Sequence, residues 1–234
     1  VPEKVRSHFA DLGKRGAELR ATWDELFAKY GEEFPELADQ LDKMQTRQLP
    51  EDWDADLPEY PADAKGAAGR DSSQKVLNLI AERVPWLIGG SSDLAPSNKS
   101  RMTFEGAGDF QPDNRAGRNL HFGIREHAAG AISNGLALSK IRPYQAGFLI
   151  FSDFQRGALR LSALMELPVI HIFTHDSIGV GEDGPTHQPV EQLASLRAMP
   201  GMIDMRPADA NEVVAAWRVI MPLRHDPVAM ILSR

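Results

Sequence analysis

From residue 70 to the end of the chain, short apolar runs alternate with segments of helical pattern. This alternation predicts an α/β fold, a parallel β-sheet with helices on both faces, because each parallel neighbour needs a crossover connection. The expected strands are residues 86–90, 119–122, 143–150, 169–173, 202–205 and 228–232. A helix capped by Ser72 or Ser73 is expected to run to residue 83, and further helices are expected at 123–138, 151–164, 189–199 and 209–221.

Residues 1–69 differ in character from the rest. Apolar side chains such as Leu19 and Trp23 recur at three- and four-residue steps, which predicts a helix, and a second helix is expected at 33–46. An acidic, proline-rich stretch follows, which is typical of an arm or linker rather than a core. We therefore expect a helical linker arm at 1–69 and an α/β domain at 70–234.

The composition argues against several classes of function. A net charge of -7 argues against a general nucleic-acid binder, although a few local arginines could still bind a small anionic substrate. No apolar run approaches the roughly 20 residues that a membrane-spanning helix needs. The chain has no cysteine, which excludes disulfides and thiolate metal sites and fits a cytoplasmic location. Since it begins at Val1 rather than at a methionine, we expect a fragment or a processed product.

A polar, glycine-rich loop at residues 174–189 follows the most apolar of the expected strands. It carries two histidines and three carboxylates, namely His175, Asp176, Glu182, Asp183 and His187. Ligands of α/β folds bind at the carboxyl ends of strands, which favours a functional loop over an ordinary surface loop. The histidines lack a short metal-binding spacing such as H-E-x-x-H, so proton transfer and hydrogen bonding to hydroxyls or phosphate suit them better.

Further candidates lie at other strand ends. Asp93 and Ser97 follow the first expected strand, and Arg234 follows the last. Taken singly, Arg70, Ser97 and Arg234 are ordinary solvated or capping residues. Together at one edge of a sheet they would form a phosphate pocket, because guanidinium groups match phosphate oxygens in geometry and charge.

An aromatic series and one carboxylate point to a ring-shaped ligand. Phe148, Phe151 and Phe154 are spaced three apart at a strand end, a spacing more typical of a core than of a cofactor pocket, although a flat ring could stack there. Glu126 lies near the start of a helix, where the helix dipole alone favours a carboxylate. The alternative is a semi-buried carboxyl that hydrogen-bonds a ligand nitrogen. The residues alone indicate part of a sugar- or phosphate-handling enzyme.

Three segments resemble transketolase: G-G-S-S-D-L-A-P-S-N at 89–98, F-G-I-R-E-H at 122–127, and the loop at 174–189. The similarity covers nearly the whole chain, since F-P-E-L at 34–37 and Q-L-P-E-D-W at 48–53 are similar to the inter-domain linker of that family. The resemblance implies the linker and the pyrimidine-binding domain. The diphosphate-binding domain and the smaller C-terminal domain would lie outside this chain.

The resemblance also implies a cofactor site. Glu126 matches the catalytic glutamate that contacts the aminopyrimidine of thiamine diphosphate. Phe148, Phe151 and Phe154 match the aromatic pocket around that ring, although many relatives carry tyrosine in place of Phe154. Asp93 matches a position close to the cofactor. The metal ion, Mg²⁺ or Ca²⁺, would be bound by the missing domain, so no metal ligand is expected here.

Substrate-binding positions of the family are matched by Arg70, Ser97, His175, Asp183, His187 and Arg234. Those that would hold the sugar phosphate are Arg70, Ser97, His175 and Arg234. Asp183 would contact a substrate hydroxyl. His187 would bond the substrate near the reacting carbons and would be the second catalytic residue.

The implied activity is transfer of a two-carbon ketol unit from a ketose phosphate to an aldose phosphate, as in the pentose phosphate pathway. The resemblance implies a cytoplasmic homodimer, and neither a nucleic acid nor a membrane is an expected partner. One alternative is another thiamine-diphosphate enzyme, such as deoxyxylulose-phosphate synthase or a pyruvate dehydrogenase beta-type subunit. Another is a non-catalytic dimerising module. Because the diphosphate and metal site would lie elsewhere, the chain alone is expected to be inactive.

Overall fold

The computed structural model describes all residues from 1 to 234 and divides into two compact units, Val1–Thr46 and Arg47–Arg234. The first unit consists of two helices, α1 (Glu3–Glu33) and α2 (Pro35–Thr46), and neither has a buried residue. Proline at the first position of α2 fits a helix start, because that N–H has no partner within a helix.

One face of α1 carries a row of aromatic side chains. Trp23 and Phe27 are stacked with ring centroids 5.0 Å apart, and Tyr30 follows at 6.3 Å from Phe27. Spacings of three and four residues bring these rings together on a helix. The apolar stripe predicted from the sequence is therefore present on this helix.

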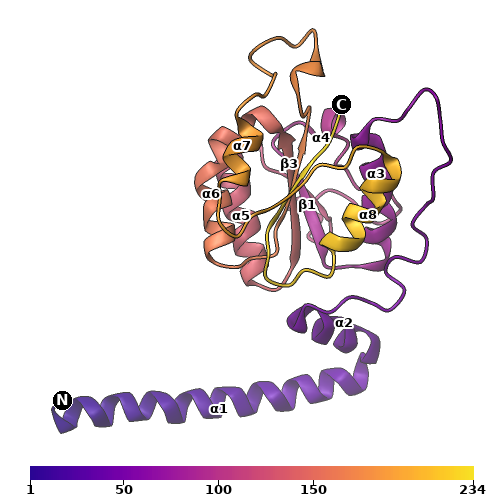
Figure 1. Cartoon of the computed structure of the whole chain (residues 1–234). Coiled ribbons are helices and arrows are strands. Elements are labelled where there is room, and N and C mark those ends of the chain that lie inside the picture. The colour runs from indigo at the N-terminus through magenta and orange to yellow at the C-terminus, as the bar shows by residue number, and fades with distance from the viewer. The chain divides into compact units, whose positions relative to one another are not determined.

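A six-stranded, all-parallel sheet forms the centre of the second unit (Figure 1). Its strands are β1 (Leu87–Ser91), β2 (Asn119–His121), β3 (Arg142–Phe148), β4 (Ile170–Thr174), β5 (Ile203–Met205) and β6 (Val228–Ile231). They are arranged in the order β2-β1-β3-β4-β6-β5. Every residue of β3, β4 and β6 is buried, as expected for parallel strands covered on both faces.

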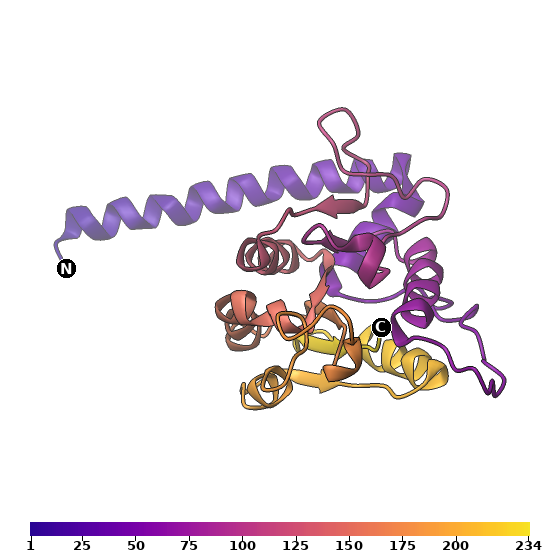
Figure 2. The ribbon, with the colours of Figure 1, turned by 90° about the horizontal axis from the view of Figure 1, so that it is seen from above.

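Helices cover both faces of the sheet, which confirms the predicted architecture (Figures 1 and 2). One face carries α3 (Gly69–Arg83) and α8 (Ala210–Ile220), which contact each other. The other face carries α5 (Glu126–Leu138), α6 (Ser152–Leu164) and the short α7 (Gln192–Arg197). A four-residue helix, α4 (Ala95–Asn98), follows β1 and was not predicted.

The predicted serine cap of α3 is wrong. The helix begins at Gly69, and Ser72 and Ser73 are buried inside it. Ser73 instead accepts a hydrogen bond from the indole Nε1 of buried Trp217 in α8, at 3.1 Å. Ser233 takes the capping role, because its side chain accepts from the Gly69 N–H at 2.9 Å. A residue at the far end of the sequence therefore sets the start of this helix.

Other element boundaries shift by a few residues. β3 ends at Phe148 and continues into a 3₁₀ turn, Leu149–Phe151, rather than remaining extended. Glu126 is the first residue of α5 rather than one turn inside it. The loop at 174–189 contains a single 3₁₀ turn, Ile178–Val180, and is otherwise irregular.

Gly90 allows β1 and β2 to lie side by side. It is paired with Leu120, and an added Cβ would lie 1.8 Å from the Leu120 carbonyl oxygen. We predict that Gly90→Ala lowers the free energy of unfolding by at least about 2 kcal/mol, because backbone cannot move aside as a flexible side chain can. Urea denaturation followed by circular dichroism measures the change.

Gly135 in α5 is the matched control, since an added Cβ would meet nothing within 4 Å. Gly135→Ala should leave stability unchanged or raise it by up to about 1 kcal/mol, because alanine favours the helix. Equal effects of the two substitutions would contradict the close approach at Gly90.

Candidate functional site

A cavity of about 550 Å³ opens at the carboxyl ends of the strands. It is lined by Arg70, Leu94, Pro96, Ser97, Lys99, Phe148, His175, Asp183, His187 and Arg234. All six residues that matched substrate-binding positions lie in this lining. Figure 2 looks down on this edge of the sheet, where the C-terminus lies near the loop at 174–189.

Arg70 reaches the cavity from the first turn of α3. Its backbone N–H donates to the Ser233 carbonyl at 3.2 Å, and its Nη1 donates to the Ser97 carbonyl at 2.9 Å. The Nε–H of Arg70 is buried and has no partner within the chain. A buried donor without a partner is costly, so an oxygen of a ligand would stabilise this site.

Arg234 reaches the cavity from the C-terminal segment, next to Ser233. Its Nη1 donates to the Val180 carbonyl at 2.8 Å, and its Nη2 pairs with Glu182 at 2.8 Å. Asp183 lies 3.6 Å from Nη1. The loop at 174–189 and the C-terminus are therefore held together by one guanidinium group.

His175 is the most enclosed side chain of the cavity. It is 2% exposed, its ring lies 3.8 Å from that of Phe148, and Thr174 Oγ1 lies 2.9 Å from its Nδ1. Its backbone φ of 58° is in the left-handed region, which is unusual for a residue other than glycine. Burial lowers its pKa to about 4, and Arg70 and Arg234 contribute to the lowering. At neutral pH the ring is therefore uncharged and can both donate and accept a hydrogen bond.

The predicted aromatic series begins beside the cavity and extends away from it. Phe148 and Phe151 have ring centroids 6.1 Å apart, and Phe151 and Phe154 are 6.3 Å apart. The rings of His187 and Phe151 are nearly perpendicular, with centroids 5.4 Å apart. Phe148 is buried, whereas Phe154 is 67% exposed, so the series is not simply part of the core.

Glu126, Asp93, Phe151 and Phe154 do not line the cavity. Glu126 is 9% exposed at the start of α5, and its carboxylate forms no hydrogen bond or ion pair within the chain. Asp93 follows β1, is exposed and has a φ of 58°. Of the predicted cofactor residues, only Phe148 lines this cavity, although the ring of Phe151 lies 5.4 Å from that of His187.

Lys99 is a cavity residue that the sequence analysis missed. It follows α4 with a φ of 56°, a conformation in which its backbone closes the helix. Its position two residues after Ser97 in a strand-end loop was the available signal. The lining therefore contains three cationic side chains, Arg70, Lys99 and Arg234, and one carboxylate, Asp183.

No cluster of three or more His, Asp or Glu side chains is placed to hold a metal ion. The helices also include none long and apolar enough to cross a membrane.

The low pKa of His175 leads to a prediction. Its ring should titrate near pH 4 in the folded chain, and Arg70→Gln should raise that midpoint by removing a positive charge beside it. NMR of the imidazole Cε1–H resonances during a pH titration measures this. Arg224→Gln, a change of a cation outside the cavity lining, is the control and should leave the midpoint unchanged.

The same shift contributes to the pH dependence of stability. Below the ordinary value of 6.5 the unfolded chain binds a proton at His175 that the folded chain does not bind. The free energy of unfolding is therefore unaffected by His175 above pH 6.5. It decreases as the pH falls from 6.5 towards 4, because protonation of His175 then favours the unfolded chain. A folded-state midpoint near 6.5 would contradict the burial and charge effects described above.

Comparison with known proteins identifies the family. The family described as "Transketolase, pyrimidine binding domain" matches residues 65–234. Transketolases from Halalkalibacterium halodurans and Bacillus subtilis are 51% and 50% identical to the whole chain, which covers 35% of each. A crystal structure of a Pichia stipitis transketolase in complex with sedoheptulose 7-phosphate matches the whole chain with a TM-score of 0.94 and 44% identity. The chain covers 35% of that structure too, so it spans about a third of the length of these relatives. The chain belongs to the transketolase family, and its α/β unit matches the pyrimidine-binding domain.

Proposed function

We propose that this chain supplies the pyrimidine-binding part of a transketolase, an enzyme that transfers a two-carbon ketol unit between sugar phosphates. The main support is the convergence of six side chains in one cavity at the carboxyl edge of the sheet. Three cations line a cavity of about 550 Å³, which is large enough for a sugar phosphate. The Pichia stipitis complex contains a sugar phosphate, which is the kind of ligand that such a cavity would bind.

In this proposal, Arg70 and Arg234 together hold the phosphate. Arg70 offers its unpartnered Nε–H. Arg234 would exchange its exposed partner Glu182 for phosphate oxygens. Exposed ion pairs contribute only about 0–1 kcal/mol, so this exchange costs little, and hydrogen bonds between arginine and phosphate are stronger.

The two histidines and Asp183 would contact the sugar itself. His175 is neutral at pH 7, so it can hydrogen-bond to a hydroxyl or phosphate oxygen without adding a fourth positive charge. Asp183 accepts from a substrate hydroxyl. His187 faces Phe148 and Phe151, and we propose that it hydrogen-bonds the substrate near the reacting carbons, as the second catalytic residue.

The residues present fit the aromatic half of thiamine diphosphate. Glu126 is 9% exposed and its carboxylate has no partner within the chain, so the carboxylate is free to hydrogen-bond a pyrimidine nitrogen. Phe148, Phe151 and Phe154 present rings at spacings suited to stacking, and Asp93 lies at the same edge of the sheet. When bound, the cofactor supplies the electron sink for carbon–carbon bond cleavage and formation. We propose that its diphosphate and a divalent metal ion, Mg²⁺ or Ca²⁺, are held outside this chain.

A homodimer is the proposed assembly. Helices α5 and α6 lie on one face of the sheet, and their exposed apolar residues besides Phe154 are Ile132, Leu138, Leu161 and Leu164. Such a surface is typical of a protein interface.

We also propose cytoplasmic ketol transfer as in the pentose phosphate pathway. The alternatives from related thiamine-diphosphate enzymes are less favoured, since matches over the whole chain are to transketolases.

The role of Glu126 can be tested in the transketolase that contains this chain. We predict that Glu126→Gln lowers kcat for ketol transfer from xylulose 5-phosphate to ribose 5-phosphate by at least about 100-fold, because a catalytic proton-transfer partner is lost. Circular dichroism checks that the fold is retained, and Glu105→Gln, an exposed carboxylate, is the control. Activity within a few-fold of the unmodified enzyme would rule out the proposed role.

Phosphate binding by Arg234 predicts a split in substrate dependence. Arg234→Gln should raise KM for xylulose 5-phosphate by about 10-fold or more, because a hydrogen bond to a charged group contributes about 1.5–3 kcal/mol. KM for unphosphorylated xylulose should change by less than about twofold. The control Lys65→Gln removes an exposed cation outside the cavity lining and should change neither value. Equal increases for both substrates would remove Arg234 from the phosphate site.

A further inference from the structure

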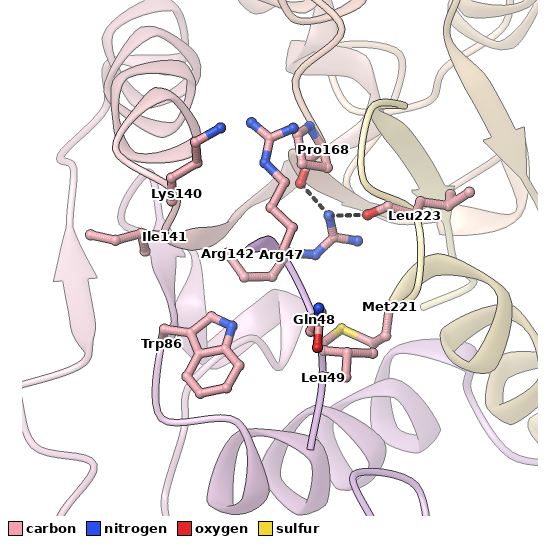
Figure 3. A pocket seen from close by; sticks show the side chains of 10 residues that line it. All are labelled: Arg47, Gln48, Leu49, Trp86, Lys140, Ile141, Arg142, Pro168, Met221 and Leu223. Carbon is pink, nitrogen blue, oxygen red and sulfur yellow. Dashed lines mark hydrogen bonds between the residues drawn. The ribbon is translucent and has the colours of Figure 1, made fainter. Parts of the chain in front are cut away.

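A second cluster of cations lies around a small cavity whose lining includes Ile141 and Arg142, at the start of β3. The lining of this cavity, about 20 Å³ in volume, contains Arg47, Lys140 and Arg142 but no carboxylate (Figure 3). Phe148, in the lining of the proposed sugar-phosphate cavity, is at the other end of the same strand. The cluster is therefore separate from that site.

Arg142 is the enclosed member of the cluster and is only 6% exposed. Its Nη1 donates to the carbonyls of Pro168 at 2.7 Å and Leu223 at 2.9 Å, the two bonds drawn in Figure 3. Its Nη2 donates to the Ile220 carbonyl at 2.5 Å. The buried Nε–H has no partner. One strong donor of a nearly buried cation thus remains unsatisfied.

Arg47 lies close enough to Arg142 for their charges to repel. Burial and, to a smaller extent, the charge of Arg47 together lower the pKa of Arg142 to about 9. Arg47 itself hydrogen-bonds only backbone carbonyls, those of Arg224 and Ala137. No carboxylate compensates either guanidinium group.

The helix ends at this cavity offset only part of the charge. Arg47 binds the last turn of α5 through Ala137, and Arg142 binds the last residue of α8, Ile220. Each helix C-terminus acts as about half a negative charge, so the two together offset about one of the positive charges. An enclosed positive charge without a counter-ion is unfavourable, so a bound anion would stabilise the cluster.

Two of these cations are held by an uncommon backbone conformation. Arg47 and Lys140 have φ angles of 55° and 68°, in the region that favours glycine. A non-glycine residue in this region is strained by about 1 kcal/mol or more. Both cationic side chains line the same cavity.

We propose that this cavity binds one small monovalent anion, such as chloride or bromide, between Arg47, Lys140 and Arg142. A cavity of about 20 Å³ has room for one occupant of about the size of water. A phosphate or sulfate with four oxygens does not fit inside it. The anion would accept the free Nε–H of Arg142 and balance the remaining charge.

Thermal unfolding of the 234-residue chain tests this proposal. Chloride is titrated at constant ionic strength with gluconate as the replacing anion, so that general screening stays fixed. The expected result is a saturable rise in Tm of about 2–4 °C once chloride exceeds its Kd several-fold. Bromide should act in the same way, and in bromide-soaked crystals its anomalous scattering peak should lie beside Arg142.

Variants separate anion binding from backbone effects. Lys140→Gly and Arg47→Gly relieve the positive-φ strain and remove a charge, so each should lose the chloride response even if its Tm without chloride rises. Glu166→Gly is the matched control, because Glu166 also has a positive φ, 53°, but lies outside the lining. It should keep the full response. A Tm that is independent of chloride, or equal responses in all variants, would overturn the proposal.

Discussion

The interaction of the C-terminal segment with the start of α3 determines where the proposed sugar-phosphate cavity forms. β6 lies inside the sheet, between β4 and β5. Because β6 is parallel to the other strands, the residues after it leave the sheet at the same carboxyl edge. Ser233 then accepts hydrogen bonds from the first N–H groups of α3, including that of Arg70. Arg70 and Arg234 are therefore brought to one cavity although they lie at opposite ends of the α/β unit in sequence. Neither arginine alone would form a phosphate site.

At this edge, Arg234 is paired with carboxylates that a ligand could replace. Arg234 pairs with Glu182 and lies near Asp183, and both carboxylates belong to the irregular loop at 174–189. His175 would add a further positive charge if it were protonated, but burial and the neighbouring arginines hold it neutral. In the proposed function, the neutral ring lets the site bind a phosphate without a further buried positive charge. The loop contributes both the exchangeable carboxylates and the neutral ring.

The sequence predicts the sheet, its parallel direction and the edge at which the functional side chains gather, because alternating strands and helices fix the polarity of every strand. It does not predict the cap of α3, since Ser233 reaches that helix only after the whole chain has folded. Ser73 has the residue type of a cap, but tertiary packing against Trp217 uses its hydroxyl instead. Lys99 was missed for a similar reason, because its place in the cavity depends on α4, a helix too short to leave a periodic pattern.

The polarity of a parallel sheet makes its two edges electrostatically different. Helices that connect parallel strands begin at the carboxyl edge and end at the amino edge, so their positive ends face one cavity and their negative ends face the other. At the carboxyl edge, the positive end of α3 adds to the attraction of Arg70 and Arg234 for a phosphate. At the amino edge, the ends of α5 and α8 allow Arg142 to be buried close to the partly exposed Arg47. Partial charges on two helix ends are smaller than the charges on three cations, and this difference favours a bound anion at the amino edge.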